Sequence, residues 1–208
     1  MRGEFQRLIP HMQDYFALLD QPRRPWLDAD SVKQKFLTLS SEIHPDRLHG
    51  APAAEREAAT QRFAELNAAW QCLREPKDRL GHLLELESGR RPKDAHDVPP
   101  AAMDLFFETG RICREADAFL ETRAKTSSPL VRAQMFAQGT ELADRLTGLH
   151  KVIARRQEEL LAEVKALDTR WETPGARPLE ELEKVYRLLS YVARSLGQVQ
   201  ERIVQLSF

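Results

Sequence analysis

The chain has 208 residues, and its 31 Lys and Arg nearly balance its 32 Asp and Glu, which gives a formal net charge of -1. This balance argues against a nucleic-acid partner, because proteins that bind duplexes usually carry a strong basic excess. Cys72 and Cys113 lie far apart without a CxxC pair, which excludes a disulfide framework and a Cys-rich zinc site. No apolar run is long enough to span a membrane, and the first residues do not resemble a secretory signal. We therefore expect a cytoplasmic protein with no membrane partner.

The N-terminal part predicts a short helix followed by an antiparallel helical hairpin. The short helix covers about residues 14–19 and stops before Pro22. The second helix begins near Asp30 or Ser31, which are good N-caps, and ends at Pro45. The third covers about residues 53–73. Each long helix has one apolar stripe of helical period, formed by Val32, Phe36, Leu39 and Ile43 in the second and by Ala59, Phe63, Leu66, Trp70 and Leu73 in the third.

A fourth helix begins at Pro76, since proline is common at the first helical position. Residues 89–100 begin with Gly89 and are rich in Pro and charged side chains, which indicates a domain boundary. Three longer helices follow, over about 101–125, 129–171 and 178–206, and their short connections indicate an up-down-up bundle. The sequence thus predicts an all-α chain with an N-terminal domain over residues 1–89, a linker over 90–100 and a three-helix bundle over 101–208.

The last helix has apolar residues at alternating intervals of three and four, as in a coiled coil. They are Leu182, Val185, Leu189, Val192, Leu196, Val199, Ile203 and Leu206. This stripe could join two chains or pack inside its own bundle. We favour packing inside the bundle, because two neighbouring apolar stripes are available to cover it.

The sequence offers no enzyme site. It has no GxxxxGK[ST] or GxGxxG phosphate-binding loop, no HExxH and no GxSxG elbow. None of the six histidines forms an i, i+4 pair that could hold a metal on a helix. We therefore expect no catalytic residue, no metal and no cofactor.

The residues that stand out are His44-Pro45-Asp46, in the loop between the second and third helices. The fixed φ of Pro45 presents two polar side chains in a limited set of directions. His44 can donate or accept a hydrogen bond, and Asp46 is a charged acceptor suited to an arginine fork. Taken alone, the tripeptide could equally be a helix stop, with Asp46 starting the next turn.

With its surroundings, the tripeptide resembles a J-domain, the chaperone-activating module of DnaJ-type proteins. The matching segments are Asp14-Tyr15-Phe16 with Leu18, the stripe that precedes the tripeptide, and Phe63-Ala64-Glu65-Leu66-Asn67-Ala68-Ala69-Trp70-Gln71-Cys72-Leu73. The chain is most similar to the HscB type, whose pattern after the J-domain is met by Pro76, Arg79, Leu83, Leu84, Leu86 and Gly89. Proteins of the HscB type also have a three-helix C-terminal domain, like the bundle expected here over residues 101–208.

This resemblance implies that the chain binds a DnaK-type chaperone such as HscA and stimulates its ATP hydrolysis. It implies that His44, Pro45 and Asp46 touch the ATPase domain of the chaperone, where Asp46 pairs with an arginine. J-domains usually turn a basic second helix toward an acidic groove of the chaperone. Here Lys33 and Lys35, with Arg47 just beyond the tripeptide, supply that charge, so electrostatic steering should be modest.

The resemblance also implies that the bundle binds an iron–sulfur scaffold protein of the IscU type and delivers it to the chaperone. In the family the first bundle helix begins with a bulky apolar cluster and a glutamate, which Leu105-Phe106-Phe107-Glu108 matches. Phe106 and Phe107 lie off the inward stripe, so at least one is expected to be exposed unless both pack against the fourth helix or the bundle. Arg111 and Arg114 replace apolar or acidic residues of the family. They leave open a J-domain co-chaperone of a general DnaK with a different client.

Overall fold

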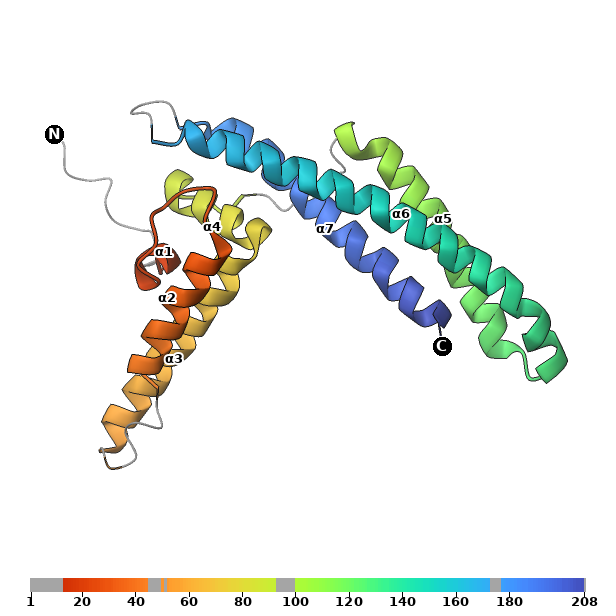
Figure 1. The fold of residues 1–208 in the computed structure, drawn as a ribbon, viewed down its shortest axis with the longest axis horizontal. Helices are drawn as coiled ribbons and strands as arrows, with labels where there is room; N and C mark the ends of the chain where they lie inside the picture. The colour runs from red at the N-terminus through yellow and green to blue at the C-terminus, as the bar shows by residue number, and fades with distance from the viewer. Residues whose placement is uncertain (1–12, 45–49, 51, 93–99, 173–176, 208) are drawn as a thin grey trace. The chain divides into compact units, whose positions relative to one another are not determined.

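The computed structural model describes residues 13–44, 50, 52–92, 100–172 and 177–207, and every regular element in these ranges is helical, which confirms the all-α class (Figure 1). No helix in these ranges is long and apolar enough to cross a membrane. The chain divides into two compact units. The first unit combines residues 1–93 with 164–183, and the second combines residues 94–163 with 184–208. The ends of two long helices thus belong to the first unit.

The first unit is built around a helical hairpin, as expected. It contains α1 (Tyr15–Leu18), α2 (Ala29–Glu42), α3 (Ala53–Arg74) and α4 (Pro76–Ser88), and the other three helices each pack on α3. The apolar stripes meet inside the hairpin, where the rings of Phe36 and Trp70 stack at 5.1 Å. Phe16, Leu19, Val32, Leu73, Leu80 and Leu83 are fully buried. The expected first-turn proline of α4 is confirmed, since Pro76 is its first residue.

The expected N-cap of α2 is wrong by two or three residues. The cap is Asp28, whose carboxylate accepts the backbone N–H of Ser31 at 2.8 Å. Asp28, Asp30 and Ser31 are all suitable cap residues. Asp28 is the one with extended backbone, at φ -69° and ψ 122°, so the helix begins at Ala29.

The loop between α1 and α2 is fixed against the last turns of α6 (Pro129–Thr169). The buried carboxylate of Asp168 accepts hydrogen bonds from Arg24 Nε and from the Trp26 backbone N–H, each at 3.0 Å. The Trp171 indole N–H donates to the backbone carbonyl of Arg23 at 2.7 Å. Backbone groups of a turn region are thus satisfied by side chains far along the chain.

The same loop is also supported from α4 by a buried guanidinium. Arg79 is 3% exposed and donates to the carbonyls of Pro25 and Leu73, at 3.1 and 2.8 Å. Burial lowers the pKa of Arg79 to about 10, which still leaves it charged at neutral pH. Arg79, one of the residues that carried the HscB resemblance, therefore has a structural role here.

The second unit is an up-down-up bundle of α5 (Met103–Lys125), which follows the short 3-10 helix η2 (Pro100–Ala102), most of α6, and most of α7 (Leu179–Ser207). The contacts fix the helix directions. Between α5 and α6 they run in opposite order, from Glu115–Arg145 to Phe119–Gly139, so these helices are antiparallel. Between α5 and α7 they run in the same order, from Phe106–Tyr191 to Asp117–Arg202, so these helices are parallel.

The heptad stripe of α7 packs inside the chain, as we favoured. Six of its eight residues are buried: Leu182, Val185, Leu189, Val192, Val199 and Leu206. Leu196 and Ile203 are half-buried. Trp171, expected at the end of the second bundle helix, lies just beyond α6 and is buried in the first unit.

Candidate functional site

His44 follows the C-cap of α2 and is half-buried against α3. Its ring meets the edge of Phe63 with ring centroids 5.2 Å apart and planes at 76°. An aromatic contact of this geometry restricts the side chain to a small part of its rotamer space. The hairpin therefore fixes the residue that opens the tripeptide. Pro45, Asp46 and Arg47 lie outside the described residues, so their expected role in chaperone binding stays a prediction.

The two lysines of α2 do not form one basic patch. Lys33 is exposed, while the ammonium group of Lys35 lies 2.6 Å from the Asp20 carboxylate. Residues two positions apart on a helix point in nearly opposite directions, whereas residues four apart share a face. Lys33 therefore shares its face with Leu37, which is 47% exposed. This combination of an exposed lysine and an exposed leucine was missed at the level of sequence, although their i, i+4 spacing is visible there.

An exposed apolar cluster lies at the start of α5. Its members are Met103, Phe106 and Phe107, which we call the α5 cluster, and they are 36%, 41% and 62% exposed. The rings of Phe106 and Phe107 meet edge to face at 5.6 Å, and the buried Tyr191 of α7 lies 6.5 Å from Phe106. Within the second unit both phenylalanines are thus exposed, which excludes the interpretation that they are core residues of the bundle. Leu105, which precedes them in the sequence, is half-buried.

Sequence reasoning missed Met103, although its spacing to Phe106 and Phe107 is the i, i+3, i+4 pattern of one helical face. That face is opposite the inward stripe of Ile112 and Ala116, which is buried. A second apolar stripe, on a helix whose other face already packs inward, predicts an exposed apolar surface, and this stripe is visible in the sequence.

The glutamate beside the α5 cluster is engaged within its own helix. The guanidinium of Arg111 donates to both carboxylate oxygens of Glu108, at 2.7 and 3.1 Å, and also to Glu115 at 2.8 Å. These hydrogen bonds and the charge of Arg111 lower the pKa of Glu108. A hydrogen bond from Arg145 lowers the pKa of Glu115 in the same way. Alternating charges along this helix neutralise one another, so a client would meet an apolar patch rather than an acidic one.

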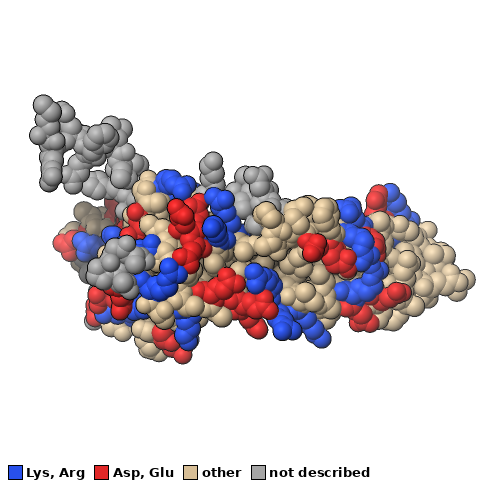
Figure 2. All heavy atoms as spheres, turned by 90° about the horizontal axis from the view of Figure 1, so that it is seen from above, with Lys and Arg blue, Asp and Glu red and all other residues tan. Residues whose placement is uncertain are grey.

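In the part of the chain that the structure describes, no three His, Cys, Asp or Glu side chains come together in a way that could hold a metal ion. Burial raises the pKa of the Cys72 thiol to about 12 and also raises that of Cys113, so neither forms the thiolate that a nucleophile needs. On the face shown in Figure 2, acidic and basic side chains are interspersed.

Comparison with known proteins agrees with this geometry. Residues 14–81 match the DnaJ domain family, a range that covers α1, α2, α3 and the start of α4. Chaperone HscB from Vibrio cholerae matches with a TM-score of 0.61 and 21% sequence identity, over 93% of this chain and 99% of that one. Residues 14–81 thus match a J-domain, and the fold of the chain is similar to that of HscB. Human co-chaperone protein HscB also matches this chain, with a TM-score of 0.61 and 17% identity, over 94% of this chain and 83% of that one.

Proposed function

We propose that this chain is a co-chaperone that stimulates ATP hydrolysis by a DnaK/HscA-type chaperone and presents a protein client to it. The observation that carries the proposal is the tripeptide His44-Pro45-Asp46, which follows α2 of a J-domain. In this role the chain activates another protein's catalytic site and contributes no catalytic residue of its own.

The residues of the J-domain have distinct roles in this proposal. Asp46 pairs with an arginine of the chaperone, because a carboxylate and a guanidinium form strong, directional hydrogen bonds. His44 is held by Phe63 beside the start of the loop. Lys33 and Leu37 extend the contact along α2, and Arg47 adds a second positive charge that speeds encounter with an acidic groove.

The test is single-turnover ATP hydrolysis by the chaperone with and without this protein. Asp46→Asn keeps the size of the side chain and removes its charge. We expect it to reduce the stimulation by at least about 10-fold, because one charge-assisted hydrogen bond is lost. The melting temperature should stay unchanged, since exposed loop side chains rarely support a core. Asp30→Asn, the same change at the opposite end of α2, is the matched control and should stimulate normally. Full stimulation by Asp46→Asn would remove the basis of the proposal.

The lysines provide a second, finer test. Lys33→Glu should weaken chaperone binding at low salt and lose that effect at high salt, as a rim charge does. Lys35→Glu should have a smaller effect, because Lys35 already pairs with Asp20 and points to another face. Equal losses from both substitutions would mean that the chaperone contacts more than the Lys33 face.

For the client, we propose an iron–sulfur scaffold protein of the IscU type, bound at the α5 cluster with Leu105 beneath it. The HscB fold favours this class of client over an unrelated one. Large apolar side chains at the centre of an interface usually dominate its energy. Phe106 and Phe107 are the exposed aromatic residues of this cluster, and Glu108 lies at its edge, partly neutralised by Arg111.

Calorimetric titration with the cognate scaffold tests this assignment. Phe106→Ala and Phe107→Ala should each weaken binding by at least about 1–2 kcal/mol. Glu108→Ala should cost less, because its carboxylate is already bound by Arg111. Val152→Ala, which truncates a 59% exposed residue of α6, is the control and should leave binding unchanged. If neither phenylalanine matters, the client binds elsewhere. If no cysteine-rich scaffold co-purifies from the native host, the alternative of a general DnaK partner with a different client is preferred.

A further inference from the structure

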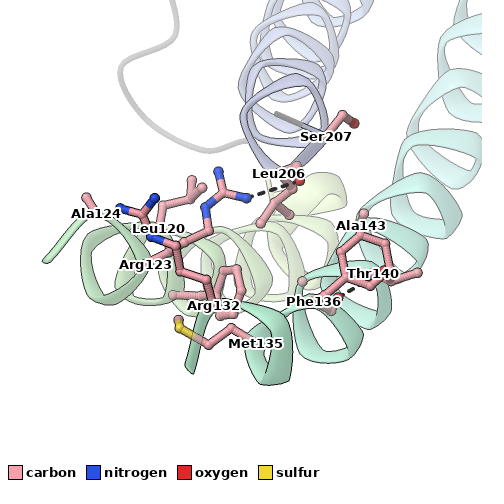
Figure 3. Close-up of a pocket in the computed structure, with 12 residues that line it drawn as sticks. Leu120, Arg123, Ala124, Arg132, Met135, Phe136, Thr140, Ala143, Leu206 and Ser207 are labelled. Atoms are coloured by element: carbon pink, nitrogen blue, oxygen red, sulfur yellow. Dashed lines mark hydrogen bonds between the residues drawn. The ribbon is translucent and has the colours of Figure 1, made fainter. Parts of the chain in front are cut away.

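The second unit has a groove at the end where α5 turns into α6, far along α5 from the α5 cluster (Figure 3). Its volume is about 700 Å³, within the range of sites that accept a small ligand or a few side chains of a peptide. The residues that matter here, which we call the distal groove, are Phe119, Arg123, Arg132, Met135, Phe136 and Leu206. They come from all three helices of the bundle.

The floor of the distal groove is apolar and rigid. The Phe119 ring is 7% exposed and packs directly on Gly139 of α6, where an added Cβ would lie only 3.1 Å from the ring. Leu206 of α7 is buried beside it. Met135 is half-buried at the wall. A close-packed floor of this kind is already formed before any partner binds, which reduces the entropic cost of binding.

Phe136 is an exposed apolar residue of the groove lining, and two more exposed apolar residues lie near it in the sequence of α6. Phe136 is 77% exposed, and Leu130 and Val131, one to two turns earlier in α6, are 70% and 41% exposed. The end of the molecule formed by this turn, at the right of Figure 2, shows mainly uncharged residues on that face. A large exposed apolar side chain beside an apolar groove favours a surface that binds another molecule.

The charge of the groove has one sign. Arg123 donates to the carbonyls of Leu206 and Gln205 at 3.3 and 2.6 Å, and Arg132 donates through Nε to the Thr126 carbonyl at 2.7 Å. Both guanidiniums therefore bind carbonyl oxygens, and neither forms an ion pair with a described carboxylate. None of the residues that line the groove is acidic. A guanidinium held by one neutral acceptor keeps other N–H groups to donate to a carboxylate.

We propose that the distal groove binds an acidic amphipathic peptide segment of a partner protein. One apolar side chain of the segment lies between Phe119 and Phe136, and a neighbouring carboxylate pairs with Arg132. The choice of occupant follows from charge complementarity, since two arginines flank an apolar floor and none of the described residues that line it is acidic. This surface is separate from the tripeptide and from the α5 cluster, so it gives the bundle a second binding partner beyond chaperone and client.

The four methionines allow a direct test in the full-length protein. Met135 lines the distal groove and Met103 belongs to the α5 cluster, while Met1 and Met12 lie outside the described residues. The protein is labelled with ¹³C-methyl methionine, and Met135→Leu assigns the groove signal. The probe is a short synthetic helix with leucines on one face and glutamates on the others. It should shift the Met135 methyl signal and leave Met103 unchanged. The same helix with lysines for glutamates should bind at least about 10-fold more weakly.

Variants of exposed residues separate binding from folding. Phe136→Ala and Arg132→Gln should each weaken binding of the acidic helix by about 10-fold, as expected for residues at the centre of a small interface. Val152→Ala and Arg155→Gln, on the same helix and similarly exposed, are the matched controls and should bind as the wild type does.

Three results would overturn the proposal. The first is no shift of the Met135 signal, and the second is equal binding of the acidic and basic helices. The third is concentration-dependent self-association in sedimentation that Phe136→Ala abolishes, which would make a second copy of the chain the occupant.

Discussion

Removing the buried carboxylate of Asp168, which pairs with Arg24, should destabilise the first unit strongly. The Asp168 side chain is 7% exposed and accepts hydrogen bonds from both Arg24 and the Trp26 backbone. Asp168→Ala leaves the Trp26 N–H without its acceptor and Arg24 without its main partner. Removing one partner of a buried pair costs about 3–5 kcal/mol. Because Arg24 is 30% exposed and regains some hydration, we expect about 3 kcal/mol, the lower end of that range.

The same guanidinium supplies the matched control. Glu172 also pairs with Arg24, at 3.0 Å, but its side chain is 76% exposed. Glu172→Ala should therefore cost less than about 1 kcal/mol, as exposed ion pairs do. Asp168→Asn should fall between the two, because its amide oxygen can still accept the Trp26 N–H.

Tryptophan fluorescence during urea unfolding measures this effect selectively. Trp26, Trp70 and Trp171 are the three tryptophans of the chain, and all lie in the first unit. The expected result is a lower midpoint with an unchanged slope, the sign of a loss of stability without a change in the unfolded state. If Asp168→Ala costs no more than Glu172→Ala, residues 164–183 do not contribute to the stability of the first unit in the way inferred here.

Four further substitutions test the packing and titration of the two units. Leu189→Ala removes a fully buried side chain of α7 and should cost about 2–5 kcal/mol by circular dichroism during unfolding. Burial lowers the pKa of His82, so the unfolded chain binds that proton more readily and stability should fall as the pH drops below about 6.5. His82→Gln should remove this pH dependence in urea titrations at acidic and neutral pH, and a persistent dependence would assign it to another group. Gly148→Ala should stabilise the chain by about 1 kcal/mol, because the new methyl group meets nothing within 4 Å. Gly139→Ala should gain less in the same thermal melt, because its methyl group would lie 3.1 Å from Phe119.

Most of the helices could be predicted from the sequence, because the start, the end and the buried face of a helix are specified by residues close together in the chain. The stripe of α7 alternates without fault from Leu182 to Leu206, and its burial follows from that period. Pro76 marks the start of α4 for an equally local reason. At the start of α2, both Asp28 and Asp30 could act as the N-cap, and the sequence did not show which of them does.

The candidate surfaces were partly predictable for the same reason. The tripeptide is a local pattern, and the exposure of Phe106 and Phe107 follows from their position off the inward stripe. The i, i+3 pair of Glu108 and Arg111 is also visible in the sequence, although its consequence for the charge of the cluster depends on the geometry of both side chains.

Tertiary structure alone decided which distant segments support the first unit. Asp168 is separated from Arg24 by 144 positions, and no periodicity links an acid near the end of α6 to a loop before α2. The distal groove likewise depends on how three helices are rotated about their axes, which places Arg123, Arg132 and Leu206 at one end of the bundle. A single sequence records the period of each helix but not the rotation or the depth at which helices meet, because those are set by the simultaneous packing of all side chains between them.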